Sequence, residues 1–549
     1  MKLAYTFVLW SGLFTATLSF SQNICRSVTE ASGDKIDEAW EKVGFRYEML
    51  SAMVNNTYGF QSQEHFLMAV KALNSLLASR EPQLFLIPKD FSSSEFPPGK
   101  IVGSVGGFQI YEIEKRTDVR PFWNHLRPQF QRIYQENQKV DFEEVFKWAV
   151  NSADPARAAV LTAQAFNDAL LESDAHAHLD PIELVKEEQS SKGEEFAGIG
   201  IQLDRREGIW KVAGFLPDGP AEVAGLKERD EILEIDGLKV HDTSEENLFK
   251  RFSGKPNEPV YVTVRRGARI LTLSILRQVV FDPLAMSRTI RGDGGTFGYL
   301  KVEEIQSPAL ISQVRKAVEG FHRNGAKGIV IDLRWNRGGT IQVTLDFISL
   351  FIGPTKQIGM TLDIRTGVKT VLPTTLPKIT DLPLLVLVNH RSCSGAEFAA
   401  AALQQTKRAY LVGNRTFGKG TAQAPYSPGS PFKGYPVFLY ETESIYYVTP
   451  GLSPQWDGVP PDFAIPWRPQ PSPEEMKFEY EGDLYPTAYE NPGAPLEVPK
   501  RKERDLIQAC LRQTGTAERA YYSTRHGDIN PKDFQLLSAA DIMRCLWRL

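Results

Sequence analysis

The chain has 549 residues, far more than the ~100–200 of a typical single domain, so several folded units are expected. Its composition, 42% hydrophobic and 24% charged, is that of an ordinary soluble globular protein. The 63 basic and 67 acidic side chains leave a net charge of -4, which gives no support to a function in nucleic-acid binding.

Residues 1–21 predict a secretory signal peptide. Lys2 precedes the largely apolar stretch 3–20, and Ser19 and Ser21 have the small-x-small spacing of a cleavage site. The alternative is an uncleaved membrane anchor, but serine, threonine and glycine residues interrupt the apolar stretch. We therefore expect cleavage after Ser21 and a periplasmic or secreted protein with no stable membrane span.

Residues 22–193 predict a mostly helical N-terminal region. Apolar residues recur at helical spacing over 66–77 and again over 160–171. Prolines and glycines between 97 and 107 interrupt this pattern and predict a loop or a short hairpin.

Residues 194–280 predict a small β module, because apolar and polar residues alternate over 260–265 and 271–275. The segment 196–201, Phe-Ala-Gly-Ile-Gly-Ile, places glycines just before a strand, where several backbone N–H groups can point outward and hold a carboxylate. The candidate residues for holding a carboxylate are Gly198, Ile199, Gly200 and Ile201.

Residues 281–466 alternate between helices and apolar strands, which predicts an α/β unit with buried strands. A helix is expected from Ser307-Pro308 to Asn324-Gly325, followed by a strand at 328–333.

Residues 467–549 form a C-terminal extension, with a proline-rich connector followed by two short amphipathic helices. Cys510 and Cys545 lie on these helices and are the plausible disulfide pair in an oxidising compartment. No CxxC motif or thiol-histidine cluster has metal-ligand spacing, so no zinc site is expected.

Two residues of the α/β unit suggest nucleophilic catalysis. Ser394 follows the apolar strand 383–389 and precedes an apolar helix, whose N-terminus favours the negative charge of a reacting oxygen. Lys419 stands between two glycines, and burial would lower its pKa so that the neutral amine could accept the serine proton. Gln423 could orient that amine by a hydrogen bond.

Each of these residues also has another interpretation. A lysine between glycines is common in surface turns, and His390 could instead act as a base for Ser394, although no acid partner for it is apparent. His176, His178 and Asp180 could form a metal site. Cys393, beside the serine, is expected to be a packing residue.

Further motifs lie in order around these residues. They are 298–302 (Gly-Tyr-Leu-Lys-Val), 332–339 (Asp-Leu-Arg-Trp-Asn-Arg-Gly-Gly), 446–451 (Tyr-Tyr-Val-Thr-Pro-Gly) and 458–462 (Gly-Val-Pro-Pro-Asp). Together they resemble the C-terminal processing, or tail-specific, peptidases over residues 166–466. Residues 196–201, with the segments 220–227 and 230–237, resemble a PDZ domain, although Arg229 stands where glycine is usual.

The resemblance implies a nucleophile at Ser394, a lysine base at Lys419 and an orienting glutamine at Gln423. Ser394 and Lys419 are 25 residues apart, as is usual in that family. Backbone N–H groups of Gly395 and of one glycine in the pair 338–339, with Gly338 preferred, would form the oxyanion hole. Residues 392–397 read Ser-Cys-Ser-Gly-Ala-Glu where the family commonly has Ser-Ala-Ser-Ala-Ser-Glu. In that family, the segment around His176 has a structural role.

The expected fold is multidomain α/β: a helical N-terminal region, a PDZ module, a crotonase-like serine protease core and a C-terminal extension. The expected function is that of an exported serine endopeptidase that selects proteins with apolar C-terminal tails and needs no metal or organic cofactor. The resemblance also allows for a periplasmic adaptor. The main alternative is a noncatalytic tail-binding scaffold. The PDZ module and the lysine disfavour an acyl-CoA enzyme of crotonase fold.

Overall fold

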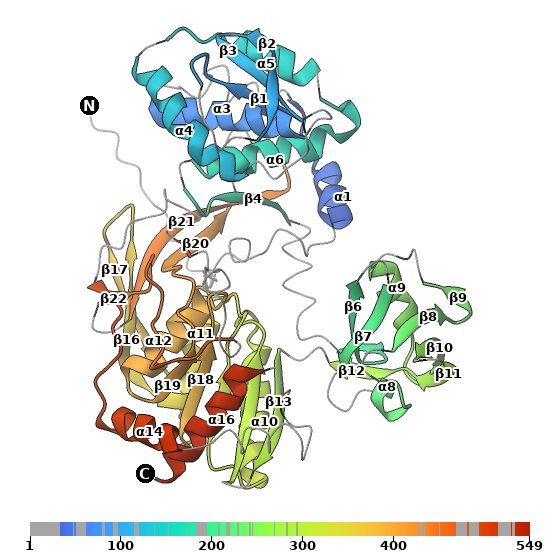
Figure 1. Cartoon of the computed structure of the whole chain (residues 1–549), viewed down its shortest axis with the longest axis vertical. Coiled ribbons are helices and arrows are strands. Elements are labelled where there is room, and N and C mark those ends of the chain that lie inside the picture. The colour runs from blue at the N-terminus through green and yellow to red at the C-terminus, as the bar shows by residue number, and fades with distance from the viewer. Residues whose placement is uncertain are drawn as a thin grey trace, which may run out of the picture.

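A computed structural model gives the structure of the chain (Figure 1). It describes residues 33–47, 49–50, 62–79, 83–91, 97–114, 120–136, 138–151, 153–172, 174–182, 195–206, 209–215, 220–227, 230–240, 243, 245–267, 269–281, 284–292, 295–427, 432, 434–448, 451–467, 480–481, 494–513, 529 and 533–549. The predicted signal peptide, Arg229, residues 449–450 and most of the connector lie outside these ranges. No helix in the described ranges is both long and apolar enough to cross a bilayer.

The N-terminal region combines helices with a three-stranded antiparallel sheet in the order β1-β3-β2. Its strands are β1 (Leu84–Ile87), β2 (Gly99–Val105) and β3 (Phe108–Ile113), and its longer helices are α1 (Gly33–Val43), α3 (Gln63–Ala78), α4 (Arg120–Gln135), α5 (Phe142–Asn151) and α6 (Ala158–Leu170). The hairpin of β2 and β3 confirms the short-hairpin alternative at residues 97–107. Strand β1 was not anticipated.

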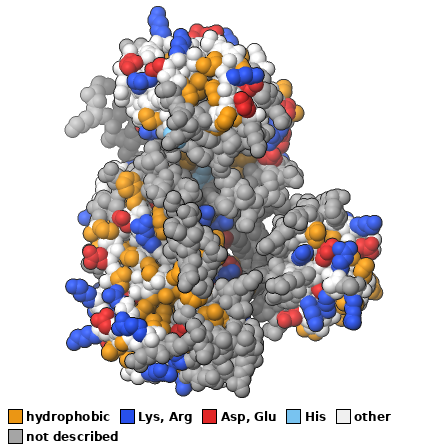
Figure 2. Space-filling model, in the orientation of Figure 1, with side chains coloured by type: hydrophobic (Ala, Val, Ile, Leu, Met, Phe, Trp, Pro, Cys, Tyr) orange, Lys and Arg blue, Asp and Glu red, His pale blue; other side chains and the backbone are white. Residues whose placement is uncertain are grey.

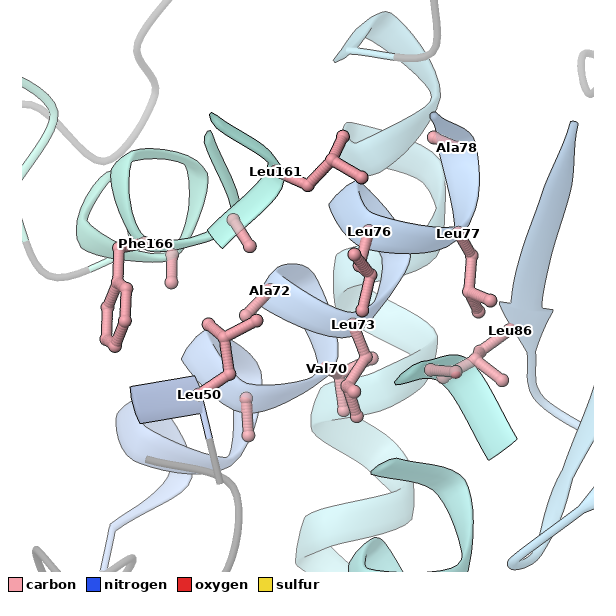
Figure 3. Close-up of a cluster of buried hydrophobic side chains, with 14 of the residues drawn as sticks. Leu50, Val70, Ala72, Leu73, Leu76, Leu77, Ala78, Leu86, Leu161 and Phe166 are labelled. Carbon is pink, nitrogen blue, oxygen red and sulfur yellow. The ribbon is translucent and has the colours of Figure 1, made fainter. Parts of the chain in front are cut away.

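One face of α3 provides the core of this region (Figure 3). Val70, Leu73 and Leu77 are spaced three and four residues apart, so they lie on one side of the helix and are almost completely buried. They belong to the same apolar cluster as Leu86 of β1 and Leu161 of α6. Burying a leucine side chain contributes about 1.5–3 kcal/mol, so these contacts add substantially to the stability of the region.

Residues 195–281 form the β module, which lies beside the rest of the molecule in Figure 1. Its main sheet has the order β11-β10-β8-β7-β6, and β5 pairs separately with β12. The strands are β5 (Glu195–Gly198), β6 (Ile201–Arg206), β7 (Ile209–Phe215), β8 (Glu231–Ile235), β9 (Leu238–Lys239), β10 (Pro259–Arg266), β11 (Arg269–Leu276) and β12 (Gln278–Phe281), with the helices α8 (Pro220–Val223) and α9 (Glu245–Phe252). Val260, Val262 and Val264 are buried, whereas Tyr261 between them is exposed, which confirms the predicted alternation.

The α/β unit is built on a six-stranded sheet in the order β13-β14-β15-β18-β19-β23, which is parallel except for β13. The strands are β13 (Ala285–Gly292), β14 (Gly295–Val302), β15 (Ile329–Asp332), β18 (Leu384–Val388), β19 (Ala409–Gly413) and β23 (Phe463–Ala464). On one face lie α10 (Ala309–Arg323), α11 (Ile341–Ile352) and α12 (Gly395–Gln405). Helix α10 and strand β15 confirm the helix and strand predicted over 307–333.

The C-terminal extension covers the other face of this sheet. Its helices are α14 (Lys502–Gln513) and α16 (Phe534–Trp547). Ile542 and Met543 of α16 share an apolar cluster with Val330 of β15, whereas its neighbours Ile329 and Ile331 face the opposite cluster. The last helix therefore belongs to the core of the α/β unit.

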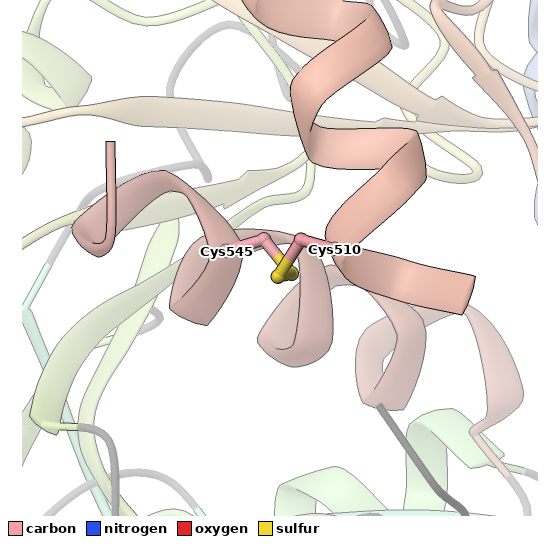
Figure 4. The surroundings of a disulfide bond; sticks show 2 residues. All are labelled: Cys510 and Cys545. Atoms are coloured by element: carbon pink, nitrogen blue, oxygen red, sulfur yellow. A yellow bond between two sulfur atoms is a disulfide. The ribbon is translucent and has the colours of Figure 1, made fainter. Parts of the chain in front are cut away.

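A disulfide joins Cys510 of α14 to Cys545 of α16, which confirms the predicted pair (Figure 4). The two cysteines are 35 residues apart. Closing a loop of that size stabilises a protein by about 3–4 kcal/mol in the chain-entropy description.

A second sheet links the N-terminal region to the α/β unit. It has the order β17-β16-β21-β22-β24, and both β20 and β4 also pair with β21. The strands are β4 (His178–Pro181), β16 (Thr355–Asp363), β17 (Lys369–Thr374), β20 (Thr421–Tyr426), β21 (Val437–Val448), β22 (Leu452–Ser453) and β24 (Ala494–Pro495). Strand β4, from the N-terminal region, pairs with residues 437–440 of β21.

Basic and acidic side chains are interspersed over the described surface of the face in Figure 2, in keeping with the small net charge.

The predicted domain limits at residues 21, 193, 280 and 466 stay predictions.

Candidate functional site

Ser394 lies at the N-cap of α12, directly after the turn that follows the fully buried strand β18. Its φ of 55° and ψ of -119° are rare for a residue other than glycine, and such strain is often found at functional sites. Its side chain is completely buried, and its Oγ makes no hydrogen bond to Lys419 or to any other group in the described part of the chain.

The turn before Ser394 is held from several sides. Ser392 Oγ donates to the carbonyl oxygen of Leu333 (2.8 Å), and Cys393 N donates to that of Asn336 (2.9 Å). Cys393 is also disulfide-bonded, so the expectation of a simple packing residue was wrong. The turn that precedes the serine is therefore held by hydrogen bonds and by the disulfide of Cys393.

Lys419 lies in the loop between β19 and β20 and is completely buried, so the surface-turn alternative is wrong. The two residues that flank Lys419 must be glycines, because a Cβ at either position would clash with neighbouring atoms. A Cβ on Gly418 would lie 2.7 Å from the carbonyl oxygen of Trp456, and one on Gly420 would lie 2.7 Å from Ser453 Oγ.

The amine of Lys419 donates to the backbone oxygen of Thr421 (3.1 Å) and to Gln423 Oε1 (2.7 Å). Burial lowers the pKa of Lys419 to about 8, while the charges of Glu481, Glu397 and Asp174 act in the opposite direction. A substantial fraction of the lysine is therefore neutral at mildly alkaline pH.

Glu397, in the first turn of α12, joins the Ser394 turn to the Lys419 loop. It accepts four hydrogen bonds, from Thr416 Oγ1 (2.5 Å), Gly418 N (2.7 Å), Ser394 N and Lys419 N (both 2.8 Å). Burial raises the pKa of Glu397 to about 8, and the four donors oppose this by favouring the carboxylate. The Tyr446 hydroxyl adds a second link between the two segments. It lies 2.9 Å from the backbone carbonyl oxygen of Ser394 and 2.7 Å from that of Lys419.

Gln423 lies on β20 and is completely buried. Its Nε2 donates to Thr421 Oγ1 and to Thr442 Oγ1, both at 3.1 Å. Thr442 in turn donates to Asp174 of the N-terminal region (2.9 Å). Sequence reasoning identified Gln423 but neither Thr442 nor Asp174.

The C-terminal extension also contributes a carboxylate near Lys419. Glu481 is completely buried, its N–H donates to the Phe417 oxygen (3.0 Å), and its Oε1 lies 2.6 Å from His176 Nε2. His178 instead contacts Asp180 (3.3 Å). The two histidines of the alternative metal site thus have different partners, and the described residues include no group of three side chains placed to hold a metal.

His390 packs edge to face against the exposed ring of Trp335, with 5.9 Å between ring centroids. Burial, aided by Arg391, lowers the pKa of His390 to about 4. No hydrogen bond joins it to Ser394 Oγ in the described structure.

Gly338 and Gly395 lie together, since a Cβ on Gly338 would lie 2.5 Å from Gly395 N. The Gly338 N–H, however, donates to Asn336 Oδ1 (2.8 Å), and Asn336 Nδ2 donates to the Val302 oxygen (2.8 Å). In this arrangement the Gly338 N–H is engaged within its own turn.

The candidate tail-binding segment joins β5 to β6. Gly200 has a φ of 70°, which favours glycine, and the side chain of Ile199 is buried in the core of the module. Gly198 pairs with Gln278, and Ile201 begins β6, the last strand in the order of its sheet. A strand in that position can accept a further strand along its edge.

Comparison with known proteins assigns two parts of the chain. Residues 296–465 match the model of peptidase family S41, and residues 197–276 match that of the PDZ domain. The carboxy-terminal processing protease CtpA of Bacillus subtilis is 30% identical over 272 residues, which are 49% of this chain and 57% of that protein. The carboxyl-terminal-processing protease of Picosynechococcus is 29% identical over 296 residues, which are 53% and 70% of the two chains.

Carboxyl-terminal-processing peptidase 1 of Arabidopsis thaliana, a chloroplast protein, is 32% identical over 303 residues, 52% of this chain and 58% of that protein. The chain thus spans little more than half the length of the Bacillus and Arabidopsis relatives. Among solved structures, a photosystem II D1 C-terminal processing protease is similar with a TM-score of 0.34 and 22% identity, over 63% of this chain and 88% of that one.

Proposed function

Because this chain is a member of the carboxyl-terminal processing proteases of peptidase family S41, a family of serine proteases, we propose that it is an exported endopeptidase in which Ser394 and Lys419 form the catalytic dyad. The observation that carries the proposal is the completely buried lysine, with a pKa of about 8, tied through Glu397 to the turn that presents Ser394.

The hydrogen bonds of Lys419 suit the role of a base. A neutral amine has two N–H bonds and one lone pair. If the N–H bonds go to the Thr421 oxygen and Gln423 Oε1, the lone pair is directed away from both and can accept the proton of Ser394.

The reaction then follows in two halves. Ser394 Oγ attacks the peptide carbonyl while Lys419 takes its proton, and Lys419 returns that proton to the departing amine as the C–N bond breaks. Water, deprotonated by the same lysine, then attacks the ester on Ser394. As the ester C–O bond breaks, Lys419 returns the proton to Ser394 Oγ and the new C-terminus is released. The N–H of Gly395, at the N-terminus of α12, would stabilise the oxyanion. The Gly338 N–H would join it only after leaving Asn336.

The reaction also requires a change of state, since Ser394 is completely buried and its Oγ is not hydrogen-bonded to Lys419. We infer that the PDZ domain supplies the trigger. An apolar tail with a free carboxylate would add along β6, with its carboxylate at residues 198–200. Such a ligand shifts the equilibrium only if it binds the open state more tightly.

The proposal also covers export of the protein and delivery of its substrates. The signal peptide would direct the protein to the periplasm or outside the cell, with a mature N-terminus at Gln22. Delivery of substrates by a periplasmic adaptor is part of this hypothesis. N-terminal sequencing of the protein purified from the exported fraction would test the cleavage site.

The dyad is tested by purified Ser394→Ala and Lys419→Ala variants on a casein-like unfolded substrate. Both should lose proteolysis while keeping the circular dichroism spectrum of wild type. Lys316→Ala, which removes an exposed lysine from α10, is the matched control and should cleave normally. Cleavage by Lys419→Ala at the wild-type rate would refute the dyad. If wild type also fails to react with a serine-directed phosphonate, the alternative of a noncatalytic tail-binding scaffold is favoured.

A further inference from the structure

A carboxylate of the N-terminal region stands at the far end of a buried hydrogen-bond chain that leads to Lys419. Asp174 lies between α6 and β4, and its Oδ1 is 2.9 Å from Thr442 Oγ1 on β21. The same Thr442 oxygen is 3.1 Å from Gln423 Nε2, and Gln423 Oε1 is 2.7 Å from Lys419 Nζ. These hydrogen bonds thus link the N-terminal region, through the paired strands β21 and β20, to the loop of Lys419.

The chemistry of the groups determines which atom donates and which accepts in each of these hydrogen bonds. The hydroxyl of Thr442 donates its single proton to Asp174 Oδ1. The Thr442 oxygen is then the acceptor for the Gln423 amide nitrogen, and the Gln423 carbonyl oxygen must face Lys419. If the amide were reversed, its NH₂ group would meet the N–H groups of the lysine.

The end of the chain is itself held firmly. Asp174 also accepts from the backbone N–H groups of Thr442 (2.6 Å) and His176 (2.9 Å). Gln423 and Thr442 are paired across β20 and β21, next to a register shift between Ala422 and Gln423. Asp174, Thr442 and Gln423 are all buried, so the low dielectric makes each bond expensive to break.

We propose that Asp174 and Thr442 are positioning residues for the proposed peptidase reaction, and that the N-terminal region completes the active site by orienting Gln423 toward Lys419. This inference rests on the proposed function. It assigns the N-terminal region a part in the reaction, in addition to its own fold.

Asp174 also affects Lys419 through its charge. Three carboxylates influence the amine from different elements: Glu481 from the C-terminal extension, Glu397 from α12 and Asp174 from the end of the N-terminal region, and each raises the pKa of Lys419. His176 lies against Glu481. Replacing Asp174 by a neutral residue therefore lowers the pKa of Lys419, whereas a change at Thr442 between neutral side chains leaves the three charges in place.

The test compares Thr442→Val with Thr442→Ser in the full-length protein. Valine has nearly the shape of threonine but no hydroxyl, whereas serine keeps the hydroxyl. With an unstructured peptide substrate, Thr442→Val should lower kcat by roughly 10- to 100-fold with little change in KM, a part of the 10²–10⁴ that a positioned base contributes. Thr442→Ser should recover most of that loss.

Asp174→Asn provides the second readout. It should lower kcat and move the rising limb of the pH-rate profile to lower pH, whereas Thr442→Val should leave the limb in place. A residue that only supports the fold would reduce the amount of folded protein without moving the limb. If Thr442→Val does not fold, kcat of Asp174→Asn decides, compared with wild type at a pH above both limbs, where Lys419 is neutral in both proteins. A lower plateau supports the positioning role, and a wild-type plateau refutes it.

Lys419→Ala measured in parallel separates the two hypotheses. An active Lys419→Ala variant refutes the proposed function itself. If Lys419→Ala is inactive while Thr442→Val and Asp174→Asn cleave at the wild-type rate with an unmoved limb, the dyad stands and the positioning role is refuted.

Discussion

Replacing Glu397 by glutamine should release the link between the Ser394 turn and the Lys419 loop. One carboxylate oxygen accepts from Thr416 and Gly418, and the other accepts from Ser394 and Lys419. In either orientation, the glutamine NH₂ group would face two buried donors. Each buried donor left without a partner costs about 1–3 kcal/mol, so the expected loss is roughly 2–6 kcal/mol at this site.

Amide hydrogen exchange, read by mass spectrometry on peptides covering 392–398 and 416–421, measures this loss locally. Exchange should be at least ~10-fold faster in Glu397→Gln, since 1.4 kcal/mol corresponds to a factor of ten. Peptidase activity should fall in parallel. Glu319→Gln, at an exposed position of α10, is the matched control and should exchange like wild type. Unchanged exchange in both peptides, together with unchanged activity, would refute the role given to Glu397.

Four further outcomes are expected. Peptide cleavage should rise with pH through about 8, because the base works only when Lys419 is neutral, and a rate independent of pH between 6 and 10 would argue against a lysine base. Gln423→Ala should lose less activity than Lys419→Ala, because the glutamine only orients the amine; equal losses in kcat would contradict this. Cys510→Ser with Cys545→Ser should destabilise the protein by about 3–4 kcal/mol, seen as a lower thermal midpoint than that of wild type without reductant, and an unchanged midpoint would contradict this. Substrates with a free apolar C-terminus should be cut faster than the same proteins ending in Asp-Asp, and deletion of residues 196–277 should abolish the difference; an unchanged ratio would assign the selection to another part of the chain.

The sequence revealed those parts of the site that local patterns encode. An apolar strand followed by a small-residue turn and an apolar helix predicts the surroundings of Ser394, and two glycines around Lys419 indicate a loop with no room for side chains. Glu397 was visible only as the last residue of a motif. Asp174, Thr442 and Glu481 reach the lysine through tertiary contacts between distant segments, and no local pattern signals such contacts.

Strand β1 and the packing of the last helix escaped prediction for related reasons. Strand β1 has four buried apolar residues in a row, so it shows no alternation, and a run that short fits either a strand or a buried helix. Helix α16 has the pattern of a helix that packs on an apolar face, but its own sequence does not say which face. The structure shows that α16 packs on the second face of the sheet, which is lined by Val330, Leu385 and Leu387.

The most direct test of the dyad is the rate at which a serine-directed phosphonate labels Ser394 as a function of pH. Wild type should show a rate that rises with a midpoint near pH 8, Ser394→Ala should not be labelled, and Lys419→Ala should be labelled very slowly at every pH. Labelling of Lys419→Ala at the wild-type rate, with the same pH midpoint, would contradict the claim that Lys419 activates Ser394.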